Sequence, residues 1–263
     1  MSRDSPLEAS PLAEPRSGTD QNPERIRAMF ARITPRYDLL NRLLSAAQDG
    51  RWRRRLVEET TAGLEPCRRL LDAATGTGDV AGAAFRRRPT ARVVGVDFSR
   101  PMLLRARTKF ARRPAMAWIE ADALRLPFRD GAFDAALVAF GLRNMVDRAA
   151  ALSELGRVIR PGGRLGILEF FEPPSPLVRR VYGLYSSWVM PRVGRWVSGS
   201  EAYGYLPHSI RCFWSPEELG RAMRQSGLVR LRRWSLSAGI VGLHVGEIPG
   251  APQAPEPDGT GHV

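Results

Sequence analysis

Residues 70–79 read Leu-Leu-Asp-Ala-Ala-Thr-Gly-Thr-Gly-Asp, and this stretch decides the fold class. Leu70 and Leu71 end an apolar run, which predicts a buried strand. The two glycines that follow allow the backbone to turn sharply and to approach a ligand closely. Asp79 then opens a helical run over residues 80–88. A strand, a Gly-rich turn and a helix in this order are typical of the nucleotide-binding start of a doubly wound α/β fold.

Acidic residues follow the next two expected strands. The run 93–97 ends on Asp97, about 20 residues after the Gly-rich turn, where this fold carries a carboxylate that binds the ribose hydroxyl pair. Asp122 comes just after an expected third strand, residues 116–120. Its carboxylate is placed to bond an adenine amino group, and an ordinary turn Asp is the alternative. Both acids therefore belong to the predicted nucleotide site.

Two nucleotide classes compete for the Gly-rich turn. Gly76, Gly78 and Ala81 formally satisfy the dinucleotide pattern G-x-G-x-x-G/A. Asp79 argues against NAD, because its carboxylate would repel a pyrophosphate at that helix N-terminus. S-adenosylmethionine carries no phosphate, and its sulfonium and ammonium groups suit acids at Asp72 and Asp79. A Gly-rich turn with an N-capping Asp and no ligand is the third interpretation. The expected cofactor-binding residues are Asp72, Gly76, Thr77, Gly78, Asp97, Asp122 and Ala123.

The bulk composition bounds the class of protein. A length of 263 residues with 43% hydrophobic content suits one large domain with a real core. The formal charge of +13 admits a nucleic-acid or anionic-membrane partner, but the arginines are scattered and favour a solvated surface. Cys67 and Cys212 lack metal-ligand spacing, so neither zinc nor a disulfide framework is expected. No run approaches about 20 apolar residues and no secretory signal is evident, so we expect a cytoplasmic protein.

One ordered domain is expected between two polar tails. Residues 1–21 and the Pro/Gly-rich residues 248–263 are expected to be disordered, which leaves 22–247 as the domain. Further strands are expected at 133–140, 164–170, 228–236 and 240–245, the last two as a hairpin. Further helices are expected at 51–60, 147–160 and 215–225, with a Pro-Gly-Gly turn at 161–163 before the fifth strand.

Two short helices precede the first strand. Asn22 is the expected N-cap of the first helix, with Pro23 at its first position and an apolar face running to residue 33. The second helix carries Tyr37 and Asn41 as part of a polar set at helical spacing. One interpretation is an N-terminal helical lid that covers a substrate. The other is an amphipathic helix pair that only seals the sheet.

The fourth expected strand ends in Gly141-Leu142-Arg143-Asn144. Ligands of open α/β sheets bind outside the carboxyl ends of the strands, so Arg143 and Asn144 are placed to face a substrate. The alternative for Arg143 is structural, as the partner of an acid that fixes the loop. We favour the catalytic interpretation because of the position.

The α/β alternation stops between residues 171 and 211, an insertion that contains four of the five tyrosines, Tyr203 among them. The segment Leu177–Trp196 combines aromatic and aliphatic residues with arginines. Such a face suits a membrane interface or a lipophilic substrate. A helix packed on the core is the alternative.

Six motifs carry a family resemblance: Tyr37–Asn41, Leu71–Asp79, Phe140–Asn144, Arg157–Leu165, Leu168–Phe170 and Tyr203–Ile210. Together they resemble the ubiquinone/menaquinone biosynthesis C-methyltransferase family, of the demethylmenaquinone methyltransferase type, over residues 23–247. Two positions depart from its pattern. Ala139 replaces a small polar residue, and Thr75 stands where the family usually has Gly or Cys.

The resemblance implies a Rossmann-like class I methyltransferase with a mostly parallel seven-stranded sheet, an antiparallel last strand and an N-terminal lid. It implies methyl transfer from S-adenosyl-L-methionine to a ring carbon of a polyprenylated quinol. Demethylmenaquinol is preferred, and the 2-polyprenyl-6-methoxy-benzoquinol precursor of ubiquinone is the alternative. Arg143 is expected to stabilise the phenolate oxygen and Asn144 to orient it, with Tyr37, Asn41 and Tyr203 at the substrate.

The partners follow from that substrate. A long prenyl tail requires transient contact with the membrane surface, for which Leu177–Trp196 is the expected segment. A homodimer stays open. No nucleic acid is expected, because a nucleic-acid methyltransferase should show clustered basic residues with stacking aromatics. A noncatalytic NAD-binding or assembly protein is the remaining rival.

Overall fold

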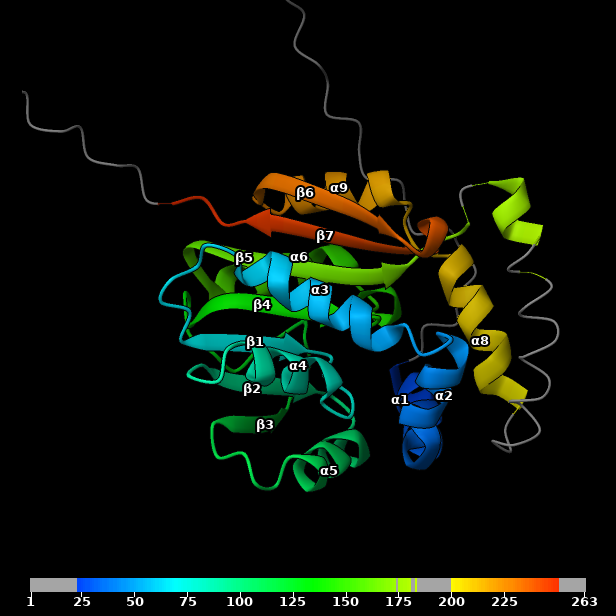
Figure 1. Cartoon of the computed structure of the whole chain (residues 1–263), viewed down its shortest axis with the longest axis horizontal. Helices are drawn as coiled ribbons and strands as arrows, with labels where there is room; N and C mark the ends of the chain where they lie inside the picture. The colour runs from blue at the N-terminus through cyan, green and yellow to red at the C-terminus, as the bar shows by residue number, and fades with distance from the viewer. Residues whose placement is uncertain (1–22, 174, 181–182, 184–199, 251–263) are drawn as a thin grey trace, which may run out of the picture.

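The computed structural model describes residues 23–173, 175–180, 183 and 200–250 (Figure 1). The expected N-terminal tail and the expected N-cap at Asn22 lie outside the described residues, as does most of the expected C-terminal tail.

A seven-stranded sheet in the order β3-β2-β1-β4-β5-β7-β6 forms the centre of the described chain. β5 and β6 both pair antiparallel with β7, whereas the pairs among β1 to β5 are parallel. The expected mostly parallel sheet with an antiparallel last strand is confirmed. The strands are β1 (Arg69–Ala73), β2 (Arg92–Asp97), β3 (Met116–Glu120), β4 (Phe133–Ala139), β5 (Ile159–Phe170), β6 (Val229–Leu236) and β7 (Val241–Glu247).

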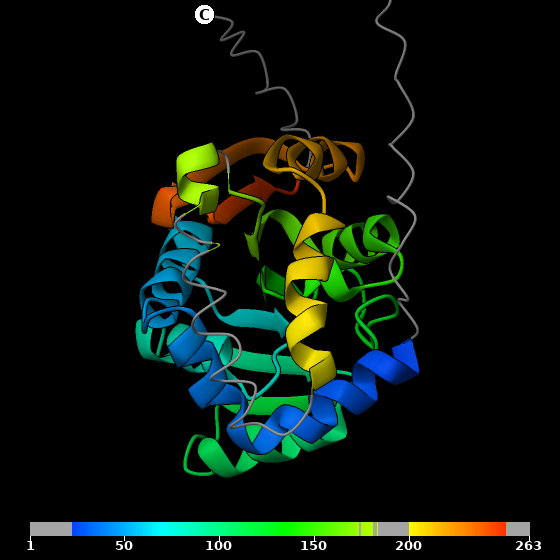
Figure 2. The same ribbon diagram turned by 90° about the vertical axis from the view of Figure 1, so that its right-hand side faces the viewer.

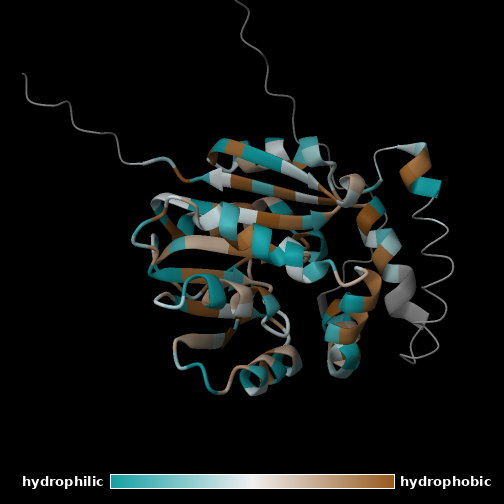
Figure 3. Ribbon diagram, in the orientation of Figure 1, coloured by the Kyte–Doolittle hydropathy of each residue, from teal (hydrophilic) through white to brown (hydrophobic). Residues whose placement is uncertain are grey.

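The apolar run at the start of the chain's central motif explains the burial of β1. Consecutive strand residues point to opposite faces of a sheet. Leu70 accordingly packs into one core cluster with Leu56 of helix α3 (Asp49–Thr61), and Leu71 into a second cluster with Leu152 of helix α6 (Arg148–Val158). Both leucines are fully buried, as expected of a parallel strand covered by helices on both faces. Figure 3 shows the corresponding brown, hydrophobic stretches along the inner strands.

Helices cover both faces of the sheet. α3 and α4 lie in front of it in Figure 1, and α6 and α9 lie behind it. The α-helices are α1 (Pro23–Ile33), α2 (Tyr37–Leu44), α3 (Asp49–Thr61), α4 (Asp79–Arg87), α5 (Arg100–Lys109), α6 (Arg148–Val158), α8 (Ser200–Arg211) and α9 (Pro216–Gln225). The short 3₁₀ turns are η1 (Thr34–Arg36), η2 (Leu142–Asn144) and η3 (Ser237–Gly239).

Three helices stand apart from these layers and position the site. α1, α2 and α8 lie beyond the carboxyl ends of the parallel strands (Figure 1). Seen from that side, α1 and α2 run below and α8 crosses in front of the strand ends (Figure 2). The N-terminal helices therefore cover the edge of the sheet at which an α/β fold binds its ligands.

One local expectation differs from the structure. The Pro-Gly-Gly segment 161–163 is not a separate turn but lies within β5, where the register shifts between Phe133 and Ala135 of β4. The shift accommodates the extra residues as a bulge. Ser99 stands at the N-cap position of α5, where its hydroxyl makes no capping hydrogen bond. By contrast, Ser215 forms the full capping box with Glu218 at the start of α9.

His244 of β7 makes stability depend on pH. Its side chain is buried, and its Nε2 lies 3.0 Å from the carbonyl oxygen of Pro216. Burial lowers its pKa to about 4. A folded-state pKa below the unfolded value means that the unfolded chain binds the proton first, so stability is lost as pH falls from about 6.5 to about 4.

We expect this single residue to cost the folded state about 3 kcal/mol between pH 7 and pH 4. Urea unfolding of the wild type and His244→Gln at both pH values checks this. The shared acid sensitivity of the carboxylates cancels in the difference. The wild type should lose more stability on acidification than the variant, and equal losses would contradict the assignment.

Candidate active site

Two pockets lie side by side beyond the carboxyl ends of the strands. The first, which we term the strand-end pocket, is lined from the ends of β1, β2 and β4, with an empty volume of about 890 Å³. The second, the lid pocket, is lined from α1, α2, α3, η2 and α8. Phe30, Tyr37 and Phe140 line both pockets. The two pockets therefore meet at these three side chains, so a ligand in one pocket would lie next to a ligand in the other.

Asp97 lines the strand-end pocket at the end of β2, as the sequence predicts. Its Oδ2 accepts a hydrogen bond from the Gly76 amide and its Oδ1 one from the Ser99 amide, each at 2.8 Å. Burial raises the pKa of the carboxyl to about 6. A carboxylate has about four acceptor positions, so the backbone hydrogen bonds from Gly76, Ser99 and Phe98 leave acceptor capacity for a ribose hydroxyl.

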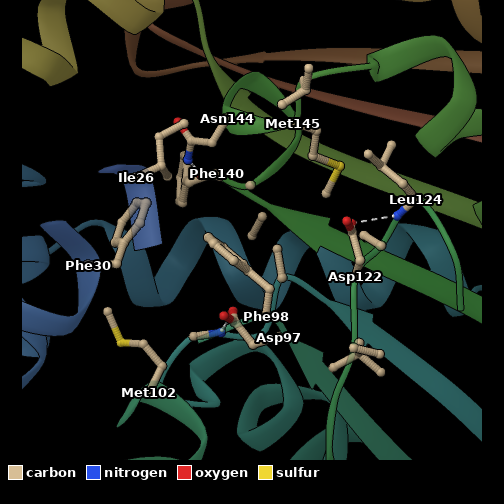
Figure 4. Close-up of a pocket in the computed structure, with 18 of the residues that line it drawn as sticks. Ile26, Phe30, Asp97, Phe98, Met102, Asp122, Leu124, Phe140, Asn144 and Met145 are labelled. Atoms are coloured by element: carbon tan, nitrogen blue, oxygen red, sulfur yellow. Dashed lines mark hydrogen bonds between the residues drawn. The ribbon is translucent and has the colours of Figure 1, made fainter. Parts of the chain in front are cut away.

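The rest of the strand-end pocket suits an adenine ring. Asp122 and Ala123 line it next to the apolar side chains of Phe98 and Leu124. The Oδ1 atom of Asp122 accepts the Leu124 amide at 2.9 Å, the dashed line in Figure 4. Ile26 and Phe30 of α1 face these residues from the opposite side (Figure 4). An acid for the ribose, an acid for the amino group and apolar walls between them fit an adenosyl group.

The Gly-rich turn positions the pocket more than it lines it. Gly76 lines the strand-end pocket with φ +55°, in the left-handed region that favours glycine. Gly78 has φ +83°, and a Cβ there would lie 2.5 Å from Trp118, so it holds the turn against the sheet. Thr77 is buried, and its hydroxyl donates to Asp38 of α2 at 2.5 Å. The sequence predicts Gly76, Thr77 and Gly78 at the cofactor. Of these three, only Gly76 is among the described residues that line the strand-end pocket.

Asp72 lies deeper than the sequence suggests. It is buried in β1, and its Oδ2 accepts hydrogen bonds from the Thr75 hydroxyl and the Ala81 amide. The departure at Thr75 therefore supplies a partner for this acid. Burial raises the pKa of Asp72 to about 7, and Oδ1 has no partner among the described residues. Asp72 ties the turn to α4 and keeps one acceptor unused.

Asp79 does not face the cofactor pocket. Its carboxylate pairs with Lys109 and lies 3.2 Å from Arg53 Nη1. The two cations that contact Asp79 come from α3 and α5, which are distant from it in the sequence. The local motif therefore gave no sign that this carboxylate is paired. Asp79 therefore joins α3, α4 and α5 and does not receive the sulfonium or ammonium group that the sequence had suggested for it.

The lid is fastened to the cofactor side of the site. Asp38 of α2 accepts from Thr77 and contacts Lys109 at 3.2 Å and Arg105 at 3.4 Å. Burial opposes ionisation, but these partners lower the pKa of Asp38 overall. Tyr37 beside it is hydrogen-bonded to Asn41, and burial raises the pKa of its phenol. Tyr37 and Asn41 both line the lid pocket, as the lid interpretation expects.

Arg143 forms the polar end of the lid pocket. Its Nη1 donates to Glu169 Oε2 at 2.9 Å and to the Phe140 carbonyl at 2.5 Å. The acid partner that the structural alternative proposed is thus present, since Glu169 is fully buried. Arg143 nevertheless also lines the pocket, and its buried Nε has no partner among the described residues. Both roles are compatible with this geometry.

Asn144 and α8 complete the site. Asn144 lines the strand-end pocket, and its Oδ1 accepts the Tyr205 hydroxyl at 3.1 Å. Tyr205 lines the lid pocket, although the sequence argument chose Tyr203. Tyr203 belongs to α8, but its side chain lies outside the described part of the structure. Most of the expected membrane segment Leu177–Trp196 also lies outside the described residues.

Solved structures share this architecture. A SAM dependent methyltransferase from Aquifex aeolicus superposes with a TM-score of 0.55 at 17% identity, over 74% of this chain and 89% of that chain. Within the described ranges, no helix has the length and hydrophobicity needed to cross a bilayer. The fold is that of a class I methyltransferase, and the lining of the strand-end pocket fits the adenosyl group of S-adenosyl-L-methionine.

The sequence comparisons give the family. Residues 18–247 match the ubiE/COQ5 methyltransferase family. The chain is 50% identical to a demethylmenaquinone methyltransferase of Thermus thermophilus, over 84% of this chain and all of that protein. It is 46% identical to a ubiquinone/menaquinone biosynthesis C-methyltransferase UbiE of Syntrophotalea carbinolica, over 85% of this chain and 95% of that protein. The chain belongs to the ubiE/COQ5 methyltransferase family and is a C-methyltransferase.

Proposed function

We propose that the chain methylates a ring carbon of demethylmenaquinol to give menaquinol. The observation that carries the proposal is the lid pocket, which is mostly apolar and adjoins the strand-end pocket across Phe30, Tyr37 and Phe140. Such a pocket suits a flat, greasy ring whose reacting carbon must approach a methyl donor next door. S-adenosyl-L-methionine, when bound, supplies an electrophilic methyl group.

The chain's residues have three tasks in this reaction. Asp97 and Asp122 hold the adenosyl end, so that the donor is fixed at the boundary of the two pockets. Arg143, which lines the lid pocket, stabilises negative charge on the quinol oxygen beside the reacting carbon. Asn144 orients that oxygen from the other pocket, held by Tyr205. The raised pKa of Tyr37 keeps its phenol protonated as a further donor.

The choice of quinone nucleus rests on the relatives. The Thermus thermophilus protein at 50% identity is a demethylmenaquinone methyltransferase, and this supports demethylmenaquinol. The Syntrophotalea carbinolica protein at 46% identity carries both ubiquinone and menaquinone in its name. The 2-polyprenyl-6-methoxy-benzoquinol precursor of ubiquinone is therefore the second candidate. Either substrate has a long prenyl tail, so we further propose transient contact with the membrane surface.

Deleting the protein from its cells tests the proposal. We expect demethylmenaquinone to accumulate and menaquinone to disappear, because the last ring methylation is lost. Extraction of the quinones and mass spectrometry measure both. Complementation with the wild type should restore menaquinone. Accumulation of the ubiquinone precursor instead would select the second candidate, and an unchanged quinone profile would contradict both.

A further inference from the structure

The methylation of a ring carbon must release one proton. The carbon–carbon bond forms with an electron pair of the ring, and the carbon–sulfur bond breaks with its pair left on sulfur. The reacting carbon then carries both the new methyl group and its original hydrogen, beside a carbonyl. Loss of that hydrogen as a proton restores the aromatic ring. Arg143 and Asn144 donate hydrogen bonds in this account, so neither takes the proton.

The lid pocket offers one carboxylate for this step. Among the described residues that line the pocket, Asp49 alone is acidic. The other acid at this end, Glu169, is fully buried and paired with Arg143. Asp49 is the first residue of α3, and 12% of its side chain remains exposed. Because Asp49 lines the pocket, the exposed part is accessible from the substrate side.

The hydrogen bonds of Asp49 leave acceptor positions for a substrate. Its Oδ1 accepts the Ser45 hydroxyl at 3.2 Å, and its Oδ2 pairs with Arg53 on the next turn of α3. A carboxylate has about four acceptor positions, so two stay available. Tyr37 and Arg143 line the same pocket from α2 and η2, and neither carries a negative charge. Ser45 and Arg53 thus hold the carboxylate of Asp49 in a fixed orientation.

Asp49 can take up a proton without leaving the guanidinium of Arg53 unpaired. Arg53 is buried, and its Nη1 lies 3.2 Å from Asp79 Oδ2 in addition to its contact with Asp49. A buried guanidinium that lost its only partner would be costly. Here the ion pair with Asp79 persists when Asp49 takes up a proton. Asp79 at the start of α4 therefore keeps Arg53 paired while Asp49 is neutral.

We propose that Asp49 is the proton acceptor of the reaction and takes the hydrogen from the methylated ring carbon. The ring C–H bond breaks, its electron pair enters the ring, and the carbonyl pair returns to the oxygen as a phenolate. The C–H proton forms the neutral acid of Asp49, and the phenolate takes up a proton from water in place of the one that the hydroxyl lost before the attack, so the net release is one proton. A carboxylate is a weak base, but a C–H bond beside a carbonyl that aromatises on losing its proton is a strong acid. Asp49 afterwards releases the proton to water. The assignment rests on the proposed function.

Asp49→Asn tests the assignment with purified full-length protein and a short-chain demethylmenaquinol. We expect kcat to fall about 10²- to 10⁴-fold, the range for losing a general base. Binding of S-adenosylhomocysteine, measured by calorimetry, should be unchanged. A ring deuterium at the reacting carbon should slow Asp49→Asn more than the wild type, because proton removal becomes rate-limiting. A purely structural role would not raise that isotope effect.

Two further variants make the test decisive. Glu59→Gln removes the acid of a matched i,i+4 ion pair on the same helix, Arg55–Glu59 at 2.8 Å, and should keep full turnover. Asp49→Glu keeps the charge beside Arg53 but displaces the carboxylate, so it should show a smaller loss and a raised isotope effect. Should Asp49→Asn not fold, Asp49→Glu decides alone.

The outcomes separate the two proposals. A wild type that does not methylate the quinol overturns the proposed function and this assignment together. A wild type that methylates it, beside Asp49 variants with normal turnover or with no increase in isotope effect, overturns the assignment of Asp49 only.

Discussion

Arg143→Ala is expected to lower turnover about 10²-fold or more, because Arg143 is the donor placed to stabilise charge on the quinol oxygen. Cofactor affinity should hardly change, since Arg143 lines the lid pocket rather than the strand-end pocket. Steady-state kinetics with demethylmenaquinol and calorimetry with S-adenosylhomocysteine measure the two quantities. Near-normal turnover in both Arg143→Ala and Arg143→Lys would contradict the catalytic role.

The ion pair of Arg143 complicates this variant. Removing the guanidinium leaves the buried Glu169 without its charge partner, which costs about 3–5 kcal/mol of stability in comparable cases. The double variant Arg143→Ala with Glu169→Gln removes both charges and should recover most of that stability. We expect it to fold and to remain inactive. Recovery of turnover in the double variant would mean that Arg143 only positions the loop.

Asp97→Ala is expected to weaken S-adenosyl-L-methionine binding by about 2–3 kcal/mol, or roughly 30- to 150-fold. The variant would lose the proposed hydrogen bonds to the ribose, and it leaves the Gly76 amide without its acceptor. The pKa of about 6 adds a pH dependence in the wild type, because a protonated Asp97 loses acceptor positions. Wild-type affinity should therefore fall below pH 6, whereas that of Asp97→Ala should not.

A matched control distinguishes loss of contact from loss of fold. Asp130 pairs with Arg157 at 2.6 Å, but its side chain is 82% exposed and lines neither pocket. Asp130→Asn should bind the cofactor like the wild type. Thermal unfolding of both variants checks that they are folded. Unchanged affinity in a folded Asp97→Ala protein would remove Asp97 from the site.

Two acids that the sequence placed at the strand ends could be located because their determinants are local. Parallel strands bring their carboxyl ends to one edge, so an acid at the end of a strand is placed by its position alone. Asp97 and Asp122 both line the pocket on this basis. The first lid helix could also be predicted, because its apolar face at helical spacing runs to residue 33, where α1 ends.

The polar network of the lid could not be predicted in the same way. Asp38 meets Thr77 across 39 positions, and Arg143 meets Glu169 across 26. No local pattern states which helix supplies the partner of a charge. The sequence prediction named Tyr203, whose side chain lies outside the described residues, and did not name Tyr205, which donates to Asn144. Side chains at positions i and i+2 of a helix point about 200° apart. Only tertiary packing decides which of them faces a pocket.

The most direct measurement supplies the purified protein with S-adenosyl-L-methionine carrying a deuterated methyl group and with reduced demethylmenaquinone. Mass spectrometry of the extracted quinone locates the label. The account predicts menaquinone with the intact labelled methyl group on the formerly unsubstituted ring carbon. Omission of the reductant should abolish the product, because only the quinol ring is nucleophilic. Label on an oxygen, or no labelled quinone at all with a protein that binds the cofactor, would contradict it.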